Sequence, residues 1–298
     1  MEASLPTRLA KLGGSVLVFA ALLLKKLIAS LLGKPGPGRC VILYYHGIGR
    51  EHRASFARQM DMLKRWATPL RVDRPAICQP GHRYVAITFD DGYENLIETA
   101  LPELESRNIP STIFVVAECL GQPACWMAHA SNGDTRVISA EQLRSLQSSL
   151  ITIGSHSLTH PDLTSVNELQ ARREIADSRR RLQEILGKEV TLFSFPYGTH
   201  NNTLVRYCRE AGYERVFTVL PSFAFAHEKE FVSGRVEVAP TDWPLEFFLK
   251  ILVAYSWLPA EFSLKRKIKM ARAALLGGTG TMDKFGIELP SRSPGSSD

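Results

Sequence analysis

The chain has 298 residues, of which 45% are hydrophobic, so it can bury a large core and general disorder is excluded. Lysine and arginine number 36 against 30 aspartate and glutamate residues, a formal net charge of +6. The sequence has no basic stripe with interleaved aromatics and none of the usual nucleic-acid motifs, so we expect no nucleic-acid partner. The five cysteines contain no Cys-x-x-Cys pair, which indicates free thiols and favours a reducing compartment, although Cys119 and Cys125 could pair.

Residues 1–34 form an apolar segment that leads into a linker rich in proline and glycine. Its longest apolar run, residues 12–24, is shorter than the roughly 20 residues that a membrane-crossing helix needs. The run has the length of a signal-peptide core, but no small-residue cleavage site follows it, and Lys25 and Lys26 interrupt the pattern. Three interpretations stay open: a signal sequence, a buried helix, or a helix within one membrane face whose lysines reach outward.

From residue 40 onward, short apolar runs alternate with helical patterns. The runs predict strands at residues 40–45, 84–89, 111–117, 150–154, 192–195 and 215–220. Helices are predicted at residues 55–66, 94–107, 139–149, from the capping box Ser165-x-x-Glu168 to Gly187, and at 202–211. This alternation predicts a parallel α/β sheet, either a barrel or an open doubly wound sheet. In both architectures, chemistry collects at the carboxyl ends of the strands.

The segment after the predicted sheet is apolar and basic together. Residues 246–276 predict basic amphipathic helices, split at Pro259. Five cations lie among the apolar residues of the second half: Lys265, Arg266, Lys267, Lys269 and Arg272. This pattern fits either a solvated face packed on the sheet domain or a contact with an anionic membrane surface. Residues 277–298 predict a flexible tail.

Two adjacent carboxylates, Asp90 and Asp91, directly follow the predicted strand at 84–89. Like charges at a strand end repel each other and raise one pKa, a cost that a bound cation removes. One carboxylate can then hold a metal ion while the other acts as a base. Gly92 permits the sharp turn that presents both side chains.

Two histidines, His156 and His160, follow the strand at 150–154. Their spacing of four places both on one face of a helical turn, where they can bind one metal ion. Together with Asp91 they make three protein ligands, which leaves room for water and substrate. Two histidines and one carboxylate suit Zn²⁺, although cobalt, nickel and manganese would also fit.

A third segment, Phe-Ser-Phe-Pro-Tyr-Gly at residues 193–198, ends another predicted strand. Pro196 and Gly198 fix an exposed turn, whose backbone N–H groups could face a developing oxyanion. Each of the three segments is common by itself. Their occurrence together, all at predicted strand ends, predicts a hydrolytic site.

These segments resemble the polysaccharide deacetylase family, the NodB-homology group of carbohydrate esterases. Residues 88–92 and 156–160 are similar to its first two motifs, and residues 195–198 to most of its third. Residues 44–47 resemble an upstream strand found in many members. The resemblance covers residues 40–245, which we take as the catalytic domain, and it implies a distorted (β/α) barrel.

The resemblance also implies roles for single residues. Asp90 would be the catalytic base, and the backbone of Tyr197 would donate to the oxyanion. Pro196 and Tyr197 would belong to the substrate-binding surface. A divalent metal ion, usually Zn²⁺, would be held by Asp91, His156 and His160.

The sequence departs from the family in two places. Many members have an arginine where this chain has Ser194, and Arg235 is our candidate to replace it in orienting the base; otherwise Arg235 is a surface ion-pair partner. The family's late histidine, often assigned as the general acid, has no counterpart. His46 is one candidate for that role, and otherwise a structural histidine. Trp243 lies in a partial fourth motif, as a substrate-binding sugar platform or a core aromatic residue.

We therefore predict a metal-dependent deacetylase that hydrolyses the N-acetyl amide of an acetylamino sugar, in a polysaccharide or a lipid-linked glycan. The alternatives are a non-catalytic carbohydrate-binding relative and a hydrolase of a non-sugar amide. The apolar start and basic end of the chain predict a peripheral membrane protein, on the cytoplasmic or the periplasmic face.

Overall fold

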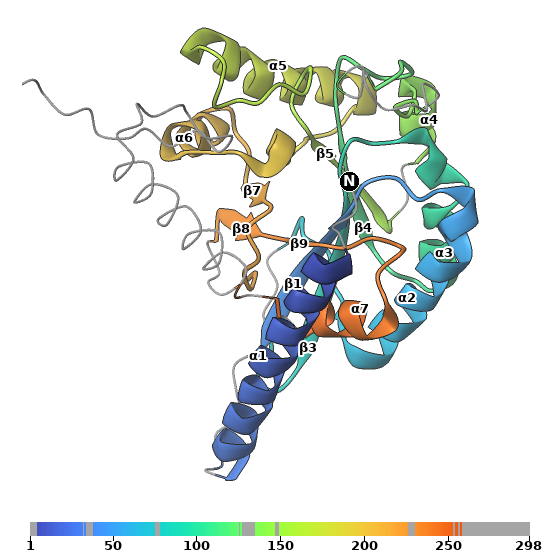
Figure 1. The fold of residues 1–298 in the computed structure, drawn as a ribbon. Helices are drawn as coiled ribbons and strands as arrows, with labels where there is room; N and C mark the ends of the chain where they lie inside the picture. The colour runs from blue at the N-terminus through green and yellow to red at the C-terminus, as the bar shows by residue number, and fades with distance from the viewer. Residues whose placement is uncertain are drawn as a thin grey trace, which may run out of the picture.

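The computed structural model contains a parallel sheet that curls into a nearly closed barrel, with helices outside it (Figure 1). It describes residues 5–31, 33, 38–74, 78–124, 126, 135–146, 149–225, 230–252, 254, 255 and 257. The strands are β1 (Arg39–Tyr45), β2 (Thr68–Pro69), β3 (Arg83–Phe89), β4 (Ser111–Val115), β5 (Ile151–Ser155), β6 (Leu192–Ser194), β7 (Arg215–Thr218), β8 (Val232–Gly234) and β9 (Val236–Glu237). The expected distorted (β/α) barrel is confirmed.

The strands follow the order β8-β7-β6-β5-β4-β3-β1-β9, and every pairing is parallel. The two outer strands are consecutive in the chain, because only Arg235 separates β8 from β9. β8 pairs with β7, and β9 pairs with β1 on the far side. Residues 232–237 therefore bring the two edges of the sheet together. The short strands β2, β8 and β9 were not predicted, because two or three residues make no readable apolar run.

The six predicted strands form because their apolar runs are covered on both faces. In β1, every residue from Cys40 to Tyr45 is buried, and in β4 every residue is buried. Parallel sheets are covered on both faces, so their strands read as continuous apolar runs without alternation. One face packs under the outer helices, and the other fills the barrel with Phe114 and Phe217, among other residues.

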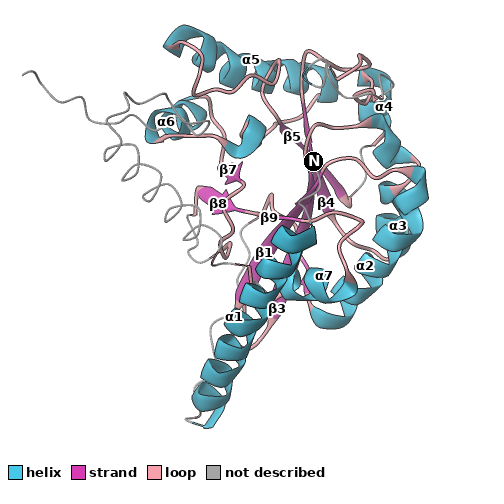
Figure 2. Cartoon of the chain, in the orientation of Figure 1, coloured by secondary structure: helices cyan, strands magenta, loops and turns pink. Residues whose placement is uncertain are grey.

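The helices that surround the barrel are drawn cyan in Figure 2. They are α2 (Arg53–Trp66), α3 (Ala100–Ser106), α4 (Ala140–Ser145), α5 (Glu168–Leu186), α6 (Asn202–Glu210) and α7 (Pro244–Ile251). Ser139 caps α4 in a capping box with Gln142, as its sequence predicts. Gly187 ends α5 in the left-handed conformation, with φ of 65°.

Two helix predictions were wrong in detail. The helix expected at 94–107 is a 3-10 helix, η2 (Glu94–Ile97), followed by α3, because Pro102 has no N–H to bond back to the preceding turn and is tolerated only in the first turn of a helix. The predicted box at Ser165 does not cap α5. Asn167 does so instead, accepting a hydrogen bond from Gln170 N, while Ser165 bonds the carbonyl of Asp162.

The apolar N-terminal segment forms a long helix, α1 (Leu5–Leu31), which packs against α7 and extends beyond the barrel (Figure 1). Helix α7 begins at Pro244, so it runs across the domain boundary predicted at 245/246. The predicted basic cluster at residues 265–272 and the tail lie outside the described residues. No disulfide joins the described cysteines Cys40, Cys78, Cys119 and Cys208 to one another, and Cys125 lies outside the described chain.

Candidate active site

The first acidic motif forms a tight turn at the end of β3. The backbone N–H of Asp90 still bonds the carbonyl of Tyr45 at 2.9 Å, so Asp90 is held as an extension of the strand. The chain then reverses through Asp91 and Gly92, with φ of 70° and 65°. A Cβ on Gly92 would lie 3.0 Å from Val115, so both the conformation and the space favour glycine. The turn thus presents two neighbouring carboxylates in different directions.

Asp90 is clamped by the guanidinium of Arg235. The two groups form a fork of two hydrogen bonds, each 2.7 Å long, between Nη1 and Oδ1 and between Nη2 and Oδ2. Both side chains are buried, with 4% and 0% exposure. Burial would raise the pKa of Asp90, but the charge of Arg235 and its hydrogen bonds lower it below the ordinary value. Asp90 is therefore held ionised.

Arg235 also joins the surrounding strands. It donates to the side chains of Thr88 at 3.1 Å and Ser194 at 2.8 Å, and to the carbonyl of Thr218 at 3.3 Å. Ser194 stands where many family members have an arginine. Here it accepts a hydrogen bond from Arg235, which lies between β8 and β9. The structure thus brings the predicted replacement, Arg235, directly onto the predicted base.

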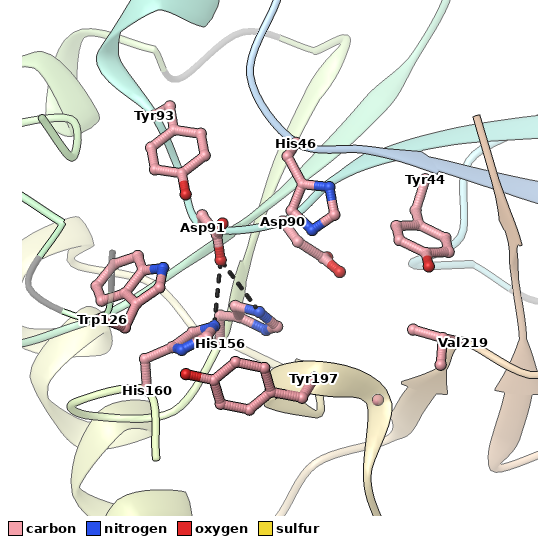
Figure 3. A pocket seen from close by; sticks show the side chains of 11 residues that line it. Tyr44, His46, Asp90, Asp91, Tyr93, Trp126, His156, His160, Tyr197 and Val219 are labelled. Atoms are coloured by element: carbon pink, nitrogen blue, oxygen red, sulfur yellow. Dashed lines mark ion pairs between the residues drawn. The ribbon is translucent and has the colours of Figure 1, made fainter. Parts of the chain in front are cut away.

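Three predicted metal ligands converge on one point. Asp91 Oδ1 lies 3.5 Å from His156 Nε2 and 3.2 Å from His160 Nε2 (Figure 3). One ligand atom from each residue lies within 4.8 Å of the other two, and all three residues are buried. One carboxylate oxygen and two imidazole nitrogens at this spacing fit a divalent ion such as Zn²⁺.

The protonation of these side chains also fits a cation. Burial lowers the pKa of His156 to about 4, so its imidazole is neutral near pH 7 and can ligate. Burial opposes ionisation of Asp91, but His160 and His156 outweigh it and lower the pKa of the carboxyl. The Nδ1 of His156 lies 2.9 Å from the carbonyl of Ser194, a contact that leaves Nε2 to face the site.

The histidine segment is a loop and not the helical turn that the spacing suggested. Ser157 and His160 both adopt positive φ, 66° each. Glu174 of α5 holds this loop from behind. Its carboxylate accepts the backbone N–H groups of Leu158 at 2.9 Å and Thr159 at 2.8 Å, and the Thr159 hydroxyl at 2.6 Å. A buried anion therefore fixes a conformation that the chain would not adopt alone.

The third segment forms a single turn, η4 (Pro196–Gly198), at the end of β6. Tyr197 has φ of 57° and an exposed ring that meets His160 edge-on, with the ring centres 4.7 Å apart. A Cβ on Gly198 would come within 2.2 Å of Val219, so the turn fits closely against the next strand end. Pro196 is buried and shapes this turn, but its side chain is not among those that line the pocket.

These strand ends surround a pocket of about 370 Å³. Figure 3 shows the ring of side chains. The pocket is lined by Tyr44, His46, Asp90, Asp91, Tyr93, Trp126, His156, His160, Tyr197, Gly198 and Val219. His46 stands at the rim, exposed to solvent, with its ring 5.8 Å from that of Tyr44. The structure therefore places His46 in the pocket, as the candidate general acid requires.

Several pocket residues escaped the sequence reasoning. Trp126 stacks on His160 with ring centres 4.5 Å apart and planes 20° from parallel, and its indole nitrogen faces Tyr93 (Figure 3). The phenol of Tyr93 bonds Asp91, and burial together with that carboxylate raises the pKa of Tyr93. Tyr93 directly follows the acidic motif, a signal that could have been used. Trp126 comes from a loop without any pattern.

The expected sugar platform, Trp243, lies elsewhere. It precedes α7, where its ring lies under Arg8 of α1 at 4.4 Å, and it does not line the pocket. Its neighbour Asp242 bonds Lys250 at 2.7 Å and so closes the α7 end of the barrel. The structure therefore places Trp243, and with it the partial fourth motif, outside the pocket.

Comparisons with known proteins agree with this geometry. The sequence model for the family described as polysaccharide deacetylase matches residues 79–216. A relative from Bacillus subtilis, named "Putative polysaccharide deacetylase YxkH", is 26% identical over 219 residues, which cover 68% of this chain and 73% of the relative. A bifunctional xylanase/xylan deacetylase from Cellvibrio japonicus is 30% identical over 129 residues, 43% of this chain and 17% of that protein.

Solved structures share the fold. The Streptococcus pyogenes deacetylase PplD aligns with a TM-score of 0.60 and 19% identity, covering 72% of this chain and 99% of that one. IcaB from Ammonifex degensii aligns with a TM-score of 0.58 and 24% identity, covering 74% and 98%. With the matching motifs at the strand ends of a barrel of this kind, residues 79–216 form a polysaccharide deacetylase (NodB-homology) domain.

Proposed function

We propose that the protein is a metal-dependent deacetylase that hydrolyses the N-acetyl amide of an acetylamino sugar in a polysaccharide or a lipid-linked glycan. One observation carries this proposal. A carboxylate held ionised by a buried arginine, Asp90, lies in one pocket with three converging metal ligands. This is the division of labour between a base and a metal site that amide hydrolysis requires.

The ligands would be Asp91, His156 and His160, and we favour Zn²⁺. Bound there, the ion would lower the pKa of water and polarise the amide carbonyl. All three ligands line the pocket, which would leave room for water and substrate beside the ion.

Side chains and backbone groups of the protein carry out the proton transfers and stabilise the negative charge. Asp90 accepts a proton from the attacking water, and Arg235 keeps its carboxylate oriented while it does so. The backbone N–H of Tyr197 donates to the oxygen that becomes negative when water adds to the carbonyl carbon. His46 at the rim gives a proton to the sugar nitrogen as the carbon–nitrogen bond breaks, which releases acetate and a free amine.

The pocket also supports a sugar as substrate. Aromatic rings of Tyr44, Tyr93, Trp126 and Tyr197 stand around the acidic and histidine side chains, and rings of this kind are common in pockets that bind organic ligands. Among the relatives, the names of two describe action on polymers: a xylan deacetylase and a peptidoglycan-N-acetylmuramic acid deacetylase of Bacillus subtilis. An acetylated glycan is therefore the substrate class we propose.

The test is acetate release from N-acetylglucosamine oligomers, with and without a chelator, by the wild type and Asp90→Asn. We expect release that needs metal and falls by about 10²–10⁴-fold in the variant, the range for loss of a general base. A folded protein that holds stoichiometric metal and releases acetate neither from these oligomers nor from a lipid-linked acetylamino sugar would overturn the proposal. Glycan binding by that protein would then indicate a carbohydrate-binding relative, and turnover of ureides or small amides a non-sugar hydrolase.

A further inference from the structure

Helix α1 is fastened to the barrel by a charged contact near its start. Arg8 pairs with Glu246 of α7 at 2.7 Å, and its guanidinium lies over the Trp243 ring at 4.4 Å. Glu246 also lies 3.6 Å from Lys250, so the contact belongs to a partly buried network of charges. A network of this kind stabilises one position of the helix more specifically than apolar packing does, because each partner has a fixed geometry.

Further contacts continue along the same face of α1. The Ser15 hydroxyl accepts a hydrogen bond from the indole of Trp257 at 3.0 Å, and Ser15 is fully buried. Phe19 meets Phe248 edge-on, with ring centres 6.1 Å apart. Residues 8, 15 and 19 are spaced by seven and four, so they form one stripe along the helix. The first half of α1 therefore packs on the barrel, at α7 and at Trp257.

The face of α1 away from the barrel is apolar and exposed. At about 100° per residue, its exposed large side chains fall within a sector of about 140°. They are Leu5, Leu9, Val16, Leu17, Leu23, Leu24, Leu27, Ile28 and Leu31. Leu17 is 73% exposed and Leu31 80%, values that no contact within the described chain reduces. An apolar surface of this length needs an occupant.

The charges of α1 lie outside that sector. On the same wheel of about 100° per residue, Arg8, Lys11 and Lys25 fall within about 100° of one another and opposite the exposed leucines. The helix contains no acidic residue. A helix that is apolar on one face and cationic on the opposite face has the pattern of helices that lie at the surface of an anionic bilayer.

Large apolar side chains also stand exposed where α1 meets the barrel. Trp66 of α2 is 44% exposed and meets Phe248 at 4.9 Å. Trp243 and Leu245, at the start of α7, are 37% and 50% exposed. Tryptophan is enriched at the membrane–water interface, where its ring is partly solvated. Exposed apolar side chains therefore stand on the barrel as well, beside the residues that α1 contacts.

From this arrangement we infer that α1 lies in the plane of one bilayer interface, with the α7 side of the barrel against the headgroups, and does not cross the membrane. Residues Leu5–Ala29 are long and apolar enough to span, with a mean hydropathy of 1.9. A span of the hydrocarbon core, about 30 Å, would take roughly 20 residues at 1.5 Å each. Every such window within Leu5–Leu31 includes Ser15 and Phe19, so a span would draw their partners Trp257 and Phe248, and with them the α7 side of the barrel, into the hydrocarbon. An in-plane helix keeps every one of these contacts.

The first experiment measures binding of the full chain to vesicles of phosphatidylcholine, with and without phosphatidylglycerol. We compare Leu17→Glu and Leu24→Glu with a matched control, Leu169→Glu, whose leucine is 71% exposed on α5. We expect the two α1 variants to bind more than tenfold more weakly, because each loses the burial of a leucine in the acyl region, and the control to bind as the wild type does. Lys11→Gln should reduce the preference for anionic vesicles severalfold.

A second experiment separates an in-plane helix from a span. In sealed membrane vesicles from cells that make the full chain, an epitope tag at the N-terminus and the barrel are exposed to added protease. An in-plane helix places both on one side, so both are cleaved together or protected together. Protection of the tag while the barrel is digested would show a span and overturn the inference.

Other outcomes overturn the inference as well. Failure of the wild type to bind either kind of vesicle would do so, as would equal loss of binding in Leu169→Glu. A dimer that forms without lipid and is abolished by Leu17→Glu would assign the apolar face to a second copy of the chain. Thermal unfolding of each variant, compared with the wild type, shows whether the barrel is intact, so a misfolded variant is recognised before binding is interpreted.

Discussion

Removal of Arg235 offers the sharpest test of how the site is held together. In Arg235→Met, five hydrogen bonds disappear, two of them to Asp90. The carboxylate is then left buried, with 4% exposure and no matched cation. Breaking a buried pair from one side costs about 3–5 kcal/mol, which is a large part of the total stability of an ordinary domain.

The assay is urea unfolding at pH 7 of Arg235→Met, Asp90→Asn and the double variant. We expect the double variant to be more stable than the sum of the two single effects predicts, by about 2 kcal/mol, because no unpaired charge remains in it. Arg53→Met is the matched control. Arg53 also bonds a carboxylate, Glu103, at 2.7 Å, but its side chain is 48% exposed, so the cost should stay below about 1 kcal/mol.

Two results would refute this reasoning. If Arg235→Met lost no more stability than Arg53→Met, the buried fork would not carry the energy assigned to it. If the two single effects simply added in the double variant, Asp90 and Arg235 would act independently, and Arg235 would not be the residue that positions the base.

Other predictions concern the ligand loops and the metal. Trp126→Ala should weaken metal binding about tenfold in a chelator competition, because the stack that orients His160 is lost; an unchanged affinity would remove Trp126 from the site. Glu174→Gln should weaken metal binding by 10–100-fold, because the histidine loop loses an anionic acceptor of two backbone N–H groups. The metal-free form of this variant should also unfold at a lower urea concentration than the metal-free wild type. Gly198→Ala should lower the melting temperature by several degrees, since its Cβ meets Val219 at 2.2 Å and its φ is 70°; a wild-type value would contradict that packing. Removal of metal by chelator should lower the melting temperature and Zn²⁺ should restore it, whereas a midpoint insensitive to both would argue against a folded-state metal site.

The strands and the acidic and histidine motifs were predictable because their signals are local. A parallel strand covered on both faces reads as a continuous apolar run, and Asp90, Asp91, His156 and His160 follow directly after such runs. The barrel then brings the ends of neighbouring strands together without any further information. The replacement of the missing arginine by Arg235 was suggested by the resemblance to the family instead, because the strand before it, β8, was too short to be predicted.

The remaining parts of the site depend on contacts that are distant in sequence. Glu174 lies mid-helix and reads as one more surface charge of α5, yet it accepts three hydrogen bonds from the histidine loop. Trp126 belongs to a loop with no periodicity, and only the folded chain places it on His160. The position of Trp243 could not be predicted for the same reason. Motif spacing carries no information on α1, whose Arg8 lies over the Trp243 ring.

The position of Arg235 between β8 and β9 makes the proposed base, Asp90, depend on the segment that joins the two edges of the sheet. The segment that matches the family ends at residue 216, before this arginine, although it contains all three motifs. A chain truncated after that point would look complete to a sequence search and would still have its metal ligands. It would nevertheless lack the cation that keeps Asp90 ionised. Catalysis by this protein would therefore require a closed barrel, because only the closed barrel places Arg235 on the proposed base.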